Sequence, residues 1–221
     1  VANCPGKNTD AVAELAIGLL VAADRRIHAA CRDLQAGEWK KKEYGKSHGL
    51  KGRVLGVLGL GAIGQSVAVK AMGMDMTVVG WSPSLTPEKA EALGIGYCES
   101  PLALATVCDA VSLHIAAKPE TRHLVDDTFL STLKDGAILV NTARGEVVDT
   151  AALKRAIATK DLRVGLDVFE NEPLTASSAA KFAELPNLVL TPHIGGVTIE
   201  SNQRVSQVTM DNVRRVLEAS K

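Results

Sequence analysis

The feature that most constrains this chain is a glycine-rich stretch at residues 54–64, Val-Leu-Gly-Val-Leu-Gly-Leu-Gly-Ala-Ile-Gly. Its apolar first half predicts a short buried strand, and a helix is expected from about 62 to 72. Between them, Gly59, Gly61 and Gly64 have the spacing G-x-G-x-x-G. The first glycine permits a tight bend, the second lets a pyrophosphate approach the backbone, and the third lets the helix pack closely on the strand. This order predicts a dinucleotide-binding turn with the phosphates at the helix N-terminus.

Strand and helix patterns alternate from Arg53 onward. Strands are expected at 54–58, 77–81, 110–115, 137–141, 163–167 and 188–190, and helices near 62–72, 87–93, 101–106, 126–132 and 149–158. Short connections between alternating elements favour right-handed βαβ units. Only 3% of residues are aromatic, so Val, Leu, Ile and Ala must form the core, as they do in parallel strands covered on both faces. We therefore expect an α/β fold, a Rossmann-type doubly wound parallel sheet with helices on both faces.

The residues outside this alternation suggest three regions. Thr9 and Asp10 are expected to cap a long helix that runs to about Gln35 and stops at Gly37. We assign 1–48 to this helix and its following loop, a linking or dimerisation segment, 49–197 to the dinucleotide-binding domain, and 198–221 to a C-terminal helix.

Charge and cysteine usage exclude several partners. The formal net charge is zero, which gives no electrostatic reason to expect nucleic acid or an anionic membrane surface. The apolar run from Ala11 to Ala23 is too short to span a bilayer and has no signal-peptide layout. The cysteines show neither C-x-x-C pairs nor zinc-ligand spacing, so no metal site is predicted. A reduced, cytoplasmic setting is the simplest expectation.

Polar side chains at the predicted strand ends suggest the chemistry, because ligands of such sheets bind outside the carboxyl ends of the strands. A histidine suits proton transfer to a substrate reduced by a nicotinamide cofactor. An arginine fork clamps a carboxylate, and a neighbouring carboxylate orients the histidine. His193, Arg144 and Glu172 are candidates for these three parts. Together they describe oxidation of a 2-hydroxy acid or reduction of a 2-keto acid.

Four segments carry a family resemblance: 59–64, Leu-Val-Asn-Thr-Ala-Arg-Gly-Glu-Val-Val-Asp at 139–149, Gly-Leu-Asp-Val-Phe-Glu-Asn-Glu-Pro at 165–173, and Thr-Pro-His-Ile-Gly-Gly at 191–196. In order and spacing, residues from about 5 to 220 resemble the cofactor-binding domain of the D-isomer-specific 2-hydroxyacid dehydrogenases. That family includes phosphoglycerate dehydrogenase and hydroxypyruvate reductase. The resemblance implies an NAD(P)-dependent oxidoreductase acting on a CH-OH group.

The same resemblance implies residue roles. Arg144 would bind the substrate carboxylate, His193 would exchange the proton on the substrate oxygen, and Glu172 would hold His193. Asp167 would lie near the nicotinamide carboxamide. The expected cofactor-binding residues are Gly59, Gly61, Ala62, Ile63, Gly64, Trp81, Ser82, Pro83, His114, Thr142, Ala143, Asp167 and Gly195. We expect Glu170 to be a solvated neighbour, and His28, His48 and His123 to be surface residues.

Two positions depart from the family pattern. Ser82 stands where relatives commonly carry an Asp that accepts from the ribose hydroxyls of NAD. No arginine follows to attract a 2′-phosphate, although Lys89 lies in the next predicted helix. We therefore expect the chain to prefer NAD and to tolerate NADP. Ala116 stands where relatives often have proline, which would loosen that loop.

The resemblance also raises expectations about assembly and activity. Family members carry a substrate or lid domain that this stretch does not match, so the 221 residues alone are expected to bind cofactor with little turnover. The first helix and its loop resemble the segment through which relatives dimerise, which favours a homodimer. Phosphoglycerate, hydroxypyruvate, sulfolactate and simple 2-keto acids all stay open as substrates. Alternatives are a dinucleotide-sensing, corepressor-like protein and a nucleotide-sugar or methyl-donor binder.

Overall fold

Seven parallel strands form one sheet in the computed structural model, which describes residues 4, 6–183, 185 and 187–219. Their order is β3-β2-β1-β4-β5-β6-β7. The strands are β1 Val54–Leu58, β2 Thr77–Trp81, β3 Gly96–Tyr97, β4 Ala110–Leu113, β5 Ile138–Asn141, β6 Arg163–Leu166 and β7 Leu188–Leu190. The strand order reverses between β1 and β4, and this is the point at which open α/β sheets bind ligands. The prediction of a Rossmann-type sheet is confirmed.

Among the described residues, six α-helices connect the strands, and side-chain caps begin four of them. The six are α4 Ala62–Met72, α5 Pro87–Ala92, α6 Pro101–Val107, α7 Asp127–Thr132, α8 Thr150–Lys160 and α9 Ala176–Ala183. The side chains of Thr86, Ser100, Asp126 and Asp149 accept hydrogen bonds from backbone N–H groups in the first turns of α5, α6, α7 and α8. Each cap satisfies donors that a helix start leaves unpaired.

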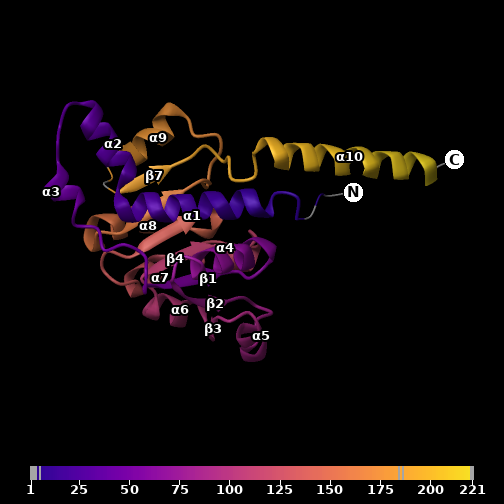
Figure 1. Ribbon diagram of the computed structural model, residues 1–221, viewed down its shortest axis with the longest axis horizontal. Coiled ribbons are helices and arrows are strands. Elements are labelled where there is room, and N and C mark those ends of the chain that lie inside the picture. Colours follow the sequence, from indigo (N-terminus) through magenta and orange to yellow (C-terminus); the bar gives the residue numbers. More distant parts are fainter. Residues whose placement is uncertain (1–3, 5, 184, 186, 220–221) are drawn as a thin grey trace.

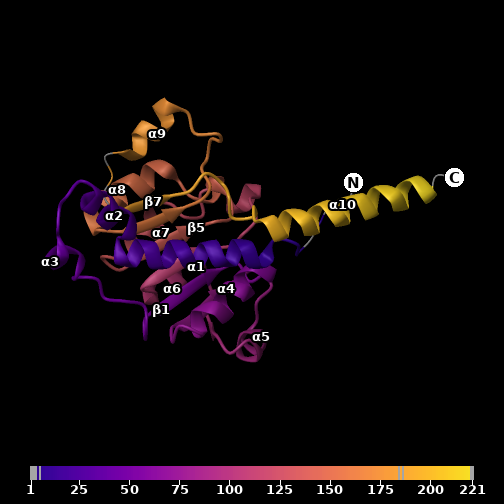
Figure 2. The same cartoon turned by 45° about the horizontal axis from the view of Figure 1, so that its top comes forward.

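Helices cover the two faces of the sheet (Figures 1 and 2), and an apolar layer lies between the helices and each face. One joins α4 and the first helix, α1 Thr9–Arg25, to Leu55 and Val57 of β1. The other joins α6, α7 and α8 to alternate strand residues such as Leu113 and Leu139. Close approach depends on two glycines: a Cβ at Gly56 would lie 2.4 Å from Leu104 Cδ2, and one at Gly165 would lie 2.9 Å from Leu19 Cβ.

The predicted long first helix is wrong in one respect, because it is broken at Arg26. This residue adopts the left-handed conformation (φ 49°, ψ 42°) and separates α1 from α2, Ile27–Gln35. Its guanidinium donates to the Glu43 carbonyl oxygen at 2.8 Å and stacks 4.9 Å from the centre of the Tyr44 ring. Both partners lie at the short helix α3, Lys41–Tyr44. These contacts between Arg26 and α3 therefore favour a turn at Arg26, although local helix propensity favours one continuous helix.

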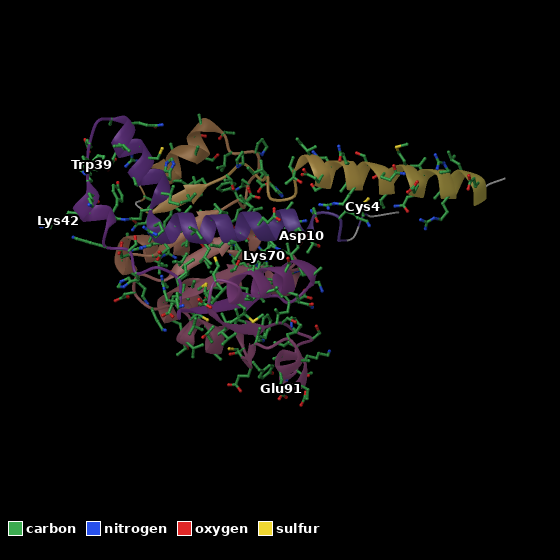
Figure 3. All side chains as sticks on the ribbon, in the orientation of Figure 1. Cys4, Asp10, Trp39, Lys42, Lys70 and Glu91 are labelled. Carbon is green, nitrogen blue, oxygen red and sulfur yellow. The ribbon has the colours of Figure 1, made fainter. Side chains whose placement is uncertain are left out.

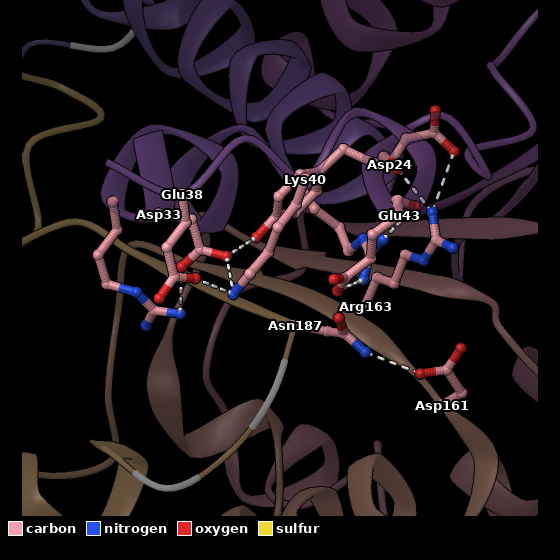
Figure 4. A network of polar contacts seen from close by, with 11 residues as sticks. Asp24, Asp33, Glu38, Lys40, Glu43, Asp161, Arg163 and Asn187 are labelled. Carbon is pink, nitrogen blue, oxygen red and sulfur yellow. Dashed lines mark hydrogen bonds and ion pairs between the residues drawn. The ribbon is translucent and has the colours of Figure 1, made fainter. Parts of the chain in front are cut away.

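A fully buried carboxylate fastens α1 to the sheet. Asp24 Oδ1 accepts from Arg53 Nη1 at 2.9 Å, and the Asp24 carbonyl oxygen accepts from Arg163 Nη1 at 2.6 Å. Arg53 precedes β1, and Arg163 begins β6. Figure 4 shows Asp24 beside Arg163, with Lys40 paired to Asp33 and Glu38 nearby. The pairs tie the end of α1 to two strands that lie on opposite sides of the switch point.

The last helix, α10 Ile199–Ala219, extends away from the sheet in both ribbon views (Figures 1 and 2). Side chains along it, including Met210, Val213 and Leu217, are exposed. No helix in the described part of the chain combines the length and apolarity needed to cross a membrane.

Candidate active site

The three glycines of the turn between β1 and α4 differ in the space around them. Gly59 has φ 102°, and a Cβ there would lie 2.6 Å from the His114 carbonyl carbon. At Gly64 a Cβ would lie 1.9 Å from the Gly59 carbonyl oxygen. At Gly61, the residue before α4, a Cβ would meet nothing within 4 Å, and no side chain caps the helix start. Two glycines are thus required by packing, and the third faces open space at a helix N-terminus.

A cleft of about 720 Å³ opens beside this turn, at the switch point between β1 and β4. Its walls bring together residues from six separate segments, and eight of these residues were predicted as site residues from sequence. These eight are Ile63, His114, Thr142, Ala143, Arg144, Asp167, His193 and Gly195. The other predicted cofactor-binding residues do not line this cleft. Gly59, Gly61, Ala62 and Gly64 lie in the β1–α4 turn and the start of α4, Trp81 ends β2, and Ser82 and Pro83 follow it.

The turn that carries Arg144 is shaped by the buried side chain of Asn141 at the end of β5. Its amide nitrogen donates to the Arg144 carbonyl oxygen at 2.9 Å, and its amide oxygen accepts from Ala143 N at 3.0 Å. The Arg144 side chain is exposed on the cleft. Beside it, Thr142 Oγ1 is buried and has no hydrogen-bond partner. A buried hydroxyl of this kind is a ready partner for a bound polar molecule.

Asp167 lines the cleft and organises the turn that carries His193. Its Oδ1 accepts from Thr191 Oγ1 at 2.6 Å and from Ile194 N at 2.9 Å, and its Oδ2 accepts from Gly195 N at 2.7 Å. The three bonds hold residues 191–195 in a tight loop in which His193 has φ 55°. The loop thereby presents the imidazole at the edge of the cleft.

His193 and Glu172 form a close imidazole–carboxylate pair, with 2.6 Å between Nδ1 and Oε2. The other carboxylate oxygen accepts from Phe169 N at 2.8 Å. Burial acts to raise the pKa of Glu172, but the hydrogen bonds from His193 and Phe169 outweigh it and leave this pKa below its ordinary value. An ionised Glu172 fixes the Nδ1-protonated tautomer of His193, so Nε2 is the atom free for proton exchange.

His193 also borders a second hollow. This hollow, of about 550 Å³, lies on the Glu172 side and is mostly apolar. Its walls are formed by Phe169, Glu172, Pro173, Leu174, Leu190, Thr191, Pro192 and His193.

The other cleft histidine, His114, is of a different kind. Its Nε2 lies 2.8 Å from Ser112 Oγ at the end of β4. Burial lowers the pKa of His114 to about 4. The ring is therefore neutral near pH 7 and is not a proton reservoir.

The segment after β2 holds Ser82, which was predicted from sequence to border the cofactor ribose. Ser82 Oγ lies 3.4 Å from Ser84 Oγ. Lys89 Nζ donates to the Ser84 carbonyl oxygen at 3.0 Å. The ammonium of Lys89 therefore reaches this segment, which the sequence alone left open.

One expectation from sequence is wrong. Glu170 is not merely solvated, because its Oε1 lies 2.6 Å from His123 Nε2. His123 was expected at the surface, and its side chain is 34% exposed. The sequence reasoning also missed cleft residues outside the motifs, namely Asn8, Val12, Ile115 and Ala117. A Cβ at Gly196 would lie 2.8 Å from Asn8 Nδ2, so the chain ahead of α1 packs on the His193 loop. No local sequence signal marks a contact between residues so far apart.

The fold, the glycine turn and the cleft at the switch point define a dinucleotide-binding α/β protein with a close imidazole–carboxylate pair at the cleft. Residues 17–195 match the family model described as the D-isomer specific 2-hydroxyacid dehydrogenase, NAD binding domain. This chain belongs to that family.

Individual relatives support the assignment. The chain is 40% identical over 220 residues to glyoxylate reductase from Thermococcus litoralis, covering 96% of this chain and 65% of the relative. It is 40% identical over 215 residues to (S)-sulfolactate dehydrogenase from Chromohalobacter salexigens, covering 96% and 68%. The apo crystal structure of D-mandelate dehydrogenase from Rhodotorula graminis superposes with a TM-score of 0.88 at 35% identity, covering 97% of this chain and 64% of that one. The chain thus spans about two thirds of the length of these relatives.

Proposed function

We propose that this chain binds a nicotinamide dinucleotide and supplies the acid–base residues of a dehydrogenase that interconverts 2-hydroxy and 2-keto acids. The observation that carries the proposal is the 2.6 Å pair of His193 and Glu172 on a cleft that also contains Arg144. A proton donor and a carboxylate clamp on one wall are what this reaction requires of the protein.

In the reductive direction, the guanidinium of Arg144 binds the substrate carboxylate through two parallel hydrogen bonds and polarises the neighbouring keto oxygen. His193 donates the proton from Nε2 to that oxygen as it gains charge. Glu172 stabilises the imidazolium before the transfer and keeps Nδ1 protonated after it. In the oxidative direction, His193 Nε2 removes the hydroxyl proton. The bound nicotinamide would supply or accept the hydride at C2.

The residues present fit such a cofactor. The open space at Gly61 leaves the N-terminal N–H groups of α4 accessible to phosphate. The unpartnered hydroxyl of Thr142 lies on the same cleft. We propose that Gly59 to Gly64 hold the pyrophosphate, that Trp81, Ser82 and Pro83 border the adenosine ribose, and that His114, Thr142, Ala143, Asp167 and Gly195 surround the nicotinamide half.

The cofactor preference we propose is NAD with NADP tolerated. Ser82 presents no carboxylate to repel a 2′-phosphate, and the Lys89 ammonium lies close to the same segment. Neither residue provides the arginine that NADP-specific sites of this fold use.

We propose slow turnover by the 221 residues on their own. The side chains of His193 and Glu172 are 48% and 32% exposed, and hydride transfer is favoured in a closed site that excludes water. Phosphoglycerate, hydroxypyruvate, sulfolactate and simple 2-keto acids stay candidates. A cytoplasmic location also stays a prediction, in keeping with four cysteines that all carry free thiols.

The direct test combines binding with kinetics. Calorimetric titration with NADH and NADPH separately is expected to give tighter NADH binding. Arg144→Ala and His193→Ala are expected to lower kcat/KM for a 2-keto acid by at least about a thousandfold, while leaving the Kd for NADH within about threefold. His48→Ala, an exposed histidine away from the cleft, is the matched control. Substantial turnover in either site variant would refute the proposed mechanism.

A dinucleotide sensor is the second candidate, because it needs the glycine turn but not the acid–base residues. It predicts NADH binding with no oxidation or reduction of any 2-keto or 2-hydroxy acid. A nucleotide-sugar or methyl-donor binder instead predicts adenosine binding without preference for a nicotinamide. The close pairing of His193 with Glu172 favours the dehydrogenase.

We propose a homodimer formed through α2 and the loop that follows it. No residue of α2 is buried, and Ile27, Leu34 and Trp39 are exposed, with Trp39 at 78%. Figure 3 places Trp39 at the end of the molecule opposite α10. A second copy would cover this apolar surface. Sedimentation is expected to give a dimer for the wild type and a weaker dimer for Trp39→Ser.

A further inference from the structure

Outside the acid–base pair, the structure contains a second imidazole–carboxylate pair. His123 Nε2 lies 2.6 Å from Glu170 Oε1, and both side chains are partly buried, with 34% and 22% exposed. Glu170 is two residues before Glu172 in the same loop. The second pair therefore lies next to the first along the chain.

Glu170 joins this loop to the start of α8. Its second oxygen accepts from Thr150 N at 3.2 Å, the first residue of that helix. Burial acts to raise the pKa of Glu170, but the hydrogen bonds from Thr150 and His123 outweigh it and leave this pKa below its ordinary value. The carboxylate is thus ionised, and a helix N-terminus favours a negative charge.

His123 joins the same loop to the turn after Arg144. Its backbone adopts the left-handed conformation (φ 51°), and its backbone N–H donates to the Glu146 carbonyl oxygen at 2.9 Å. Glu146 lies in the 3-10 helix η2, Gly145–Val147, which directly follows Arg144. One histidine therefore contacts both the Arg144 turn and, through Glu170, the Glu172 loop.

The two segments also touch directly. A Cβ at Gly145 would lie 1.9 Å from the Phe169 carbonyl carbon and 2.4 Å from Glu170 N. Gly145 therefore packs against the peptide bond between Phe169 and Glu170. The backbone N–H of Phe169 donates to Glu172 Oε1. A shift of Glu170 would therefore move the donor that orients Glu172.

We propose that Glu170 and His123 are positioning residues, a brace that sets Glu172 relative to His193 and Arg144. The inference rests on the proposed dehydrogenase function, in which Glu172 holds His193. Neither brace residue lines the substrate cleft, so the brace would act through Glu172 and not on the substrate.

The test uses the folded chain with two readouts. Glu170→Ala is expected to lower kcat about tenfold with the KM for NADH within about twofold, because a misplacement of about 1 Å at a reacting group costs up to about a hundredfold. Glu170→Gln retains an oxygen for Thr150 N and is expected to recover part of the loss. Long-range ¹H–¹⁵N spectra of the histidines report the His193 tautomer without turnover, and Glu170→Ala is expected to reduce the Nδ1-protonated form.

His123→Asn is the second variant, because asparagine tolerates the left-handed conformation but is too short to reach Glu170. It is expected to change both readouts in the same direction as Glu170→Ala. Asp127→Asn is the matched control, since it removes an exposed pair with Arg155 of α8 at 2.6 Å. Unchanged His193 spectra in both brace variants, or equal losses in Asp127→Asn, would overturn the brace. A wild type that binds no NADH would instead reject the proposed function, and the spectra would still test the brace.

Discussion

Alanine substitution of two glycines in the β1–α4 turn is expected to affect different properties of the protein, namely stability at Gly64 and NADH binding at Gly61. A Cβ at Gly64 would lie 1.9 Å from the Gly59 carbonyl oxygen, and an ordinary carbon–oxygen contact is about 3.3–3.6 Å. The start of α4 would have to move by roughly 1.5 Å. Overpacking of this size costs about 1–3 kcal/mol, and a rigid backbone neighbour places it near the upper end. Gly64→Ala is therefore expected to lower the free energy of unfolding by about 3 kcal/mol.

Gly61→Ala is expected to leave folding intact and to impair binding. Its φ of −70° and ψ of −171° suit alanine, and nothing lies within 4 Å of the new Cβ. The free energy of unfolding should change by less than about 1 kcal/mol. The methyl group would project where a phosphate approaches α4, and a tenfold rise in the Kd for NADH corresponds to about 1.4 kcal/mol. We expect at least that rise.

Urea unfolding followed by circular dichroism measures the first quantity, and calorimetry with NADH measures the second. Gly18→Ala is the control, because Gly18 is exposed within α1 and has no neighbour near a new Cβ. It is expected to stabilise the protein by about 1 kcal/mol through helix propensity. Wild-type NADH affinity in Gly61→Ala would refute the assignment of this turn to the pyrophosphate.

Three further predictions concern the buried carboxylate, the neutral histidine and the ribose site. Asp24→Ala leaves Arg53 and Arg163 without their carboxylate and is expected to lower the free energy of unfolding by about 3–5 kcal/mol in urea. Burial lowers the pKa of His114 from 6.5 to about 4 in the folded state. Between these two pH values the unfolded state binds more protons than the folded state. The free energy of unfolding is therefore expected to fall by about 3 kcal/mol as the pH drops from 6.5 to about 4. His114→Gln should flatten this part of the pH–stability curve, and an unchanged slope would contradict the burial argument. Ser82→Asp is expected to raise the Kd for NADPH at least about tenfold relative to NADH, because the new carboxylate repels a 2′-phosphate; equal calorimetric affinities would place the ribose elsewhere.

Three strands could be predicted from sequence to the residue. The ranges 54–58, 77–81 and 188–190 agree with β1, β2 and the edge strand β7, because each is a short apolar run bounded by turn residues. β3 was missed, since Gly96 and Tyr97 are exposed and show no alternation. The break at Arg26 was missed because its cause is tertiary, namely contacts with Glu43 and Tyr44.

Some residues of the candidate site could be predicted from sequence, and others could not. Arg144, Glu172 and His193 could be named because each lies in a motif at a strand end, and the structure brings Arg144 and His193 to one cleft with Glu172 bonded to His193. The Glu170–His123 pair joins residues 47 apart and depends on a left-handed histidine. No periodicity or spacing predicts such a backbone conformation.

The packing of α1 has a consequence for the growing chain. Leu19 rests against Gly165 of β6, and Asp24 binds Arg163, which lies 139 residues further on. A ribosome adding about 5–20 residues per second needs roughly 7–28 s to make that interval. During this time the strand β6 is missing, and only the earlier strands and α4 can cover the apolar side of α1. The packing of α1 is therefore completed long after the helix is synthesised, which leaves part of its apolar side open to chaperones and to aggregation during translation.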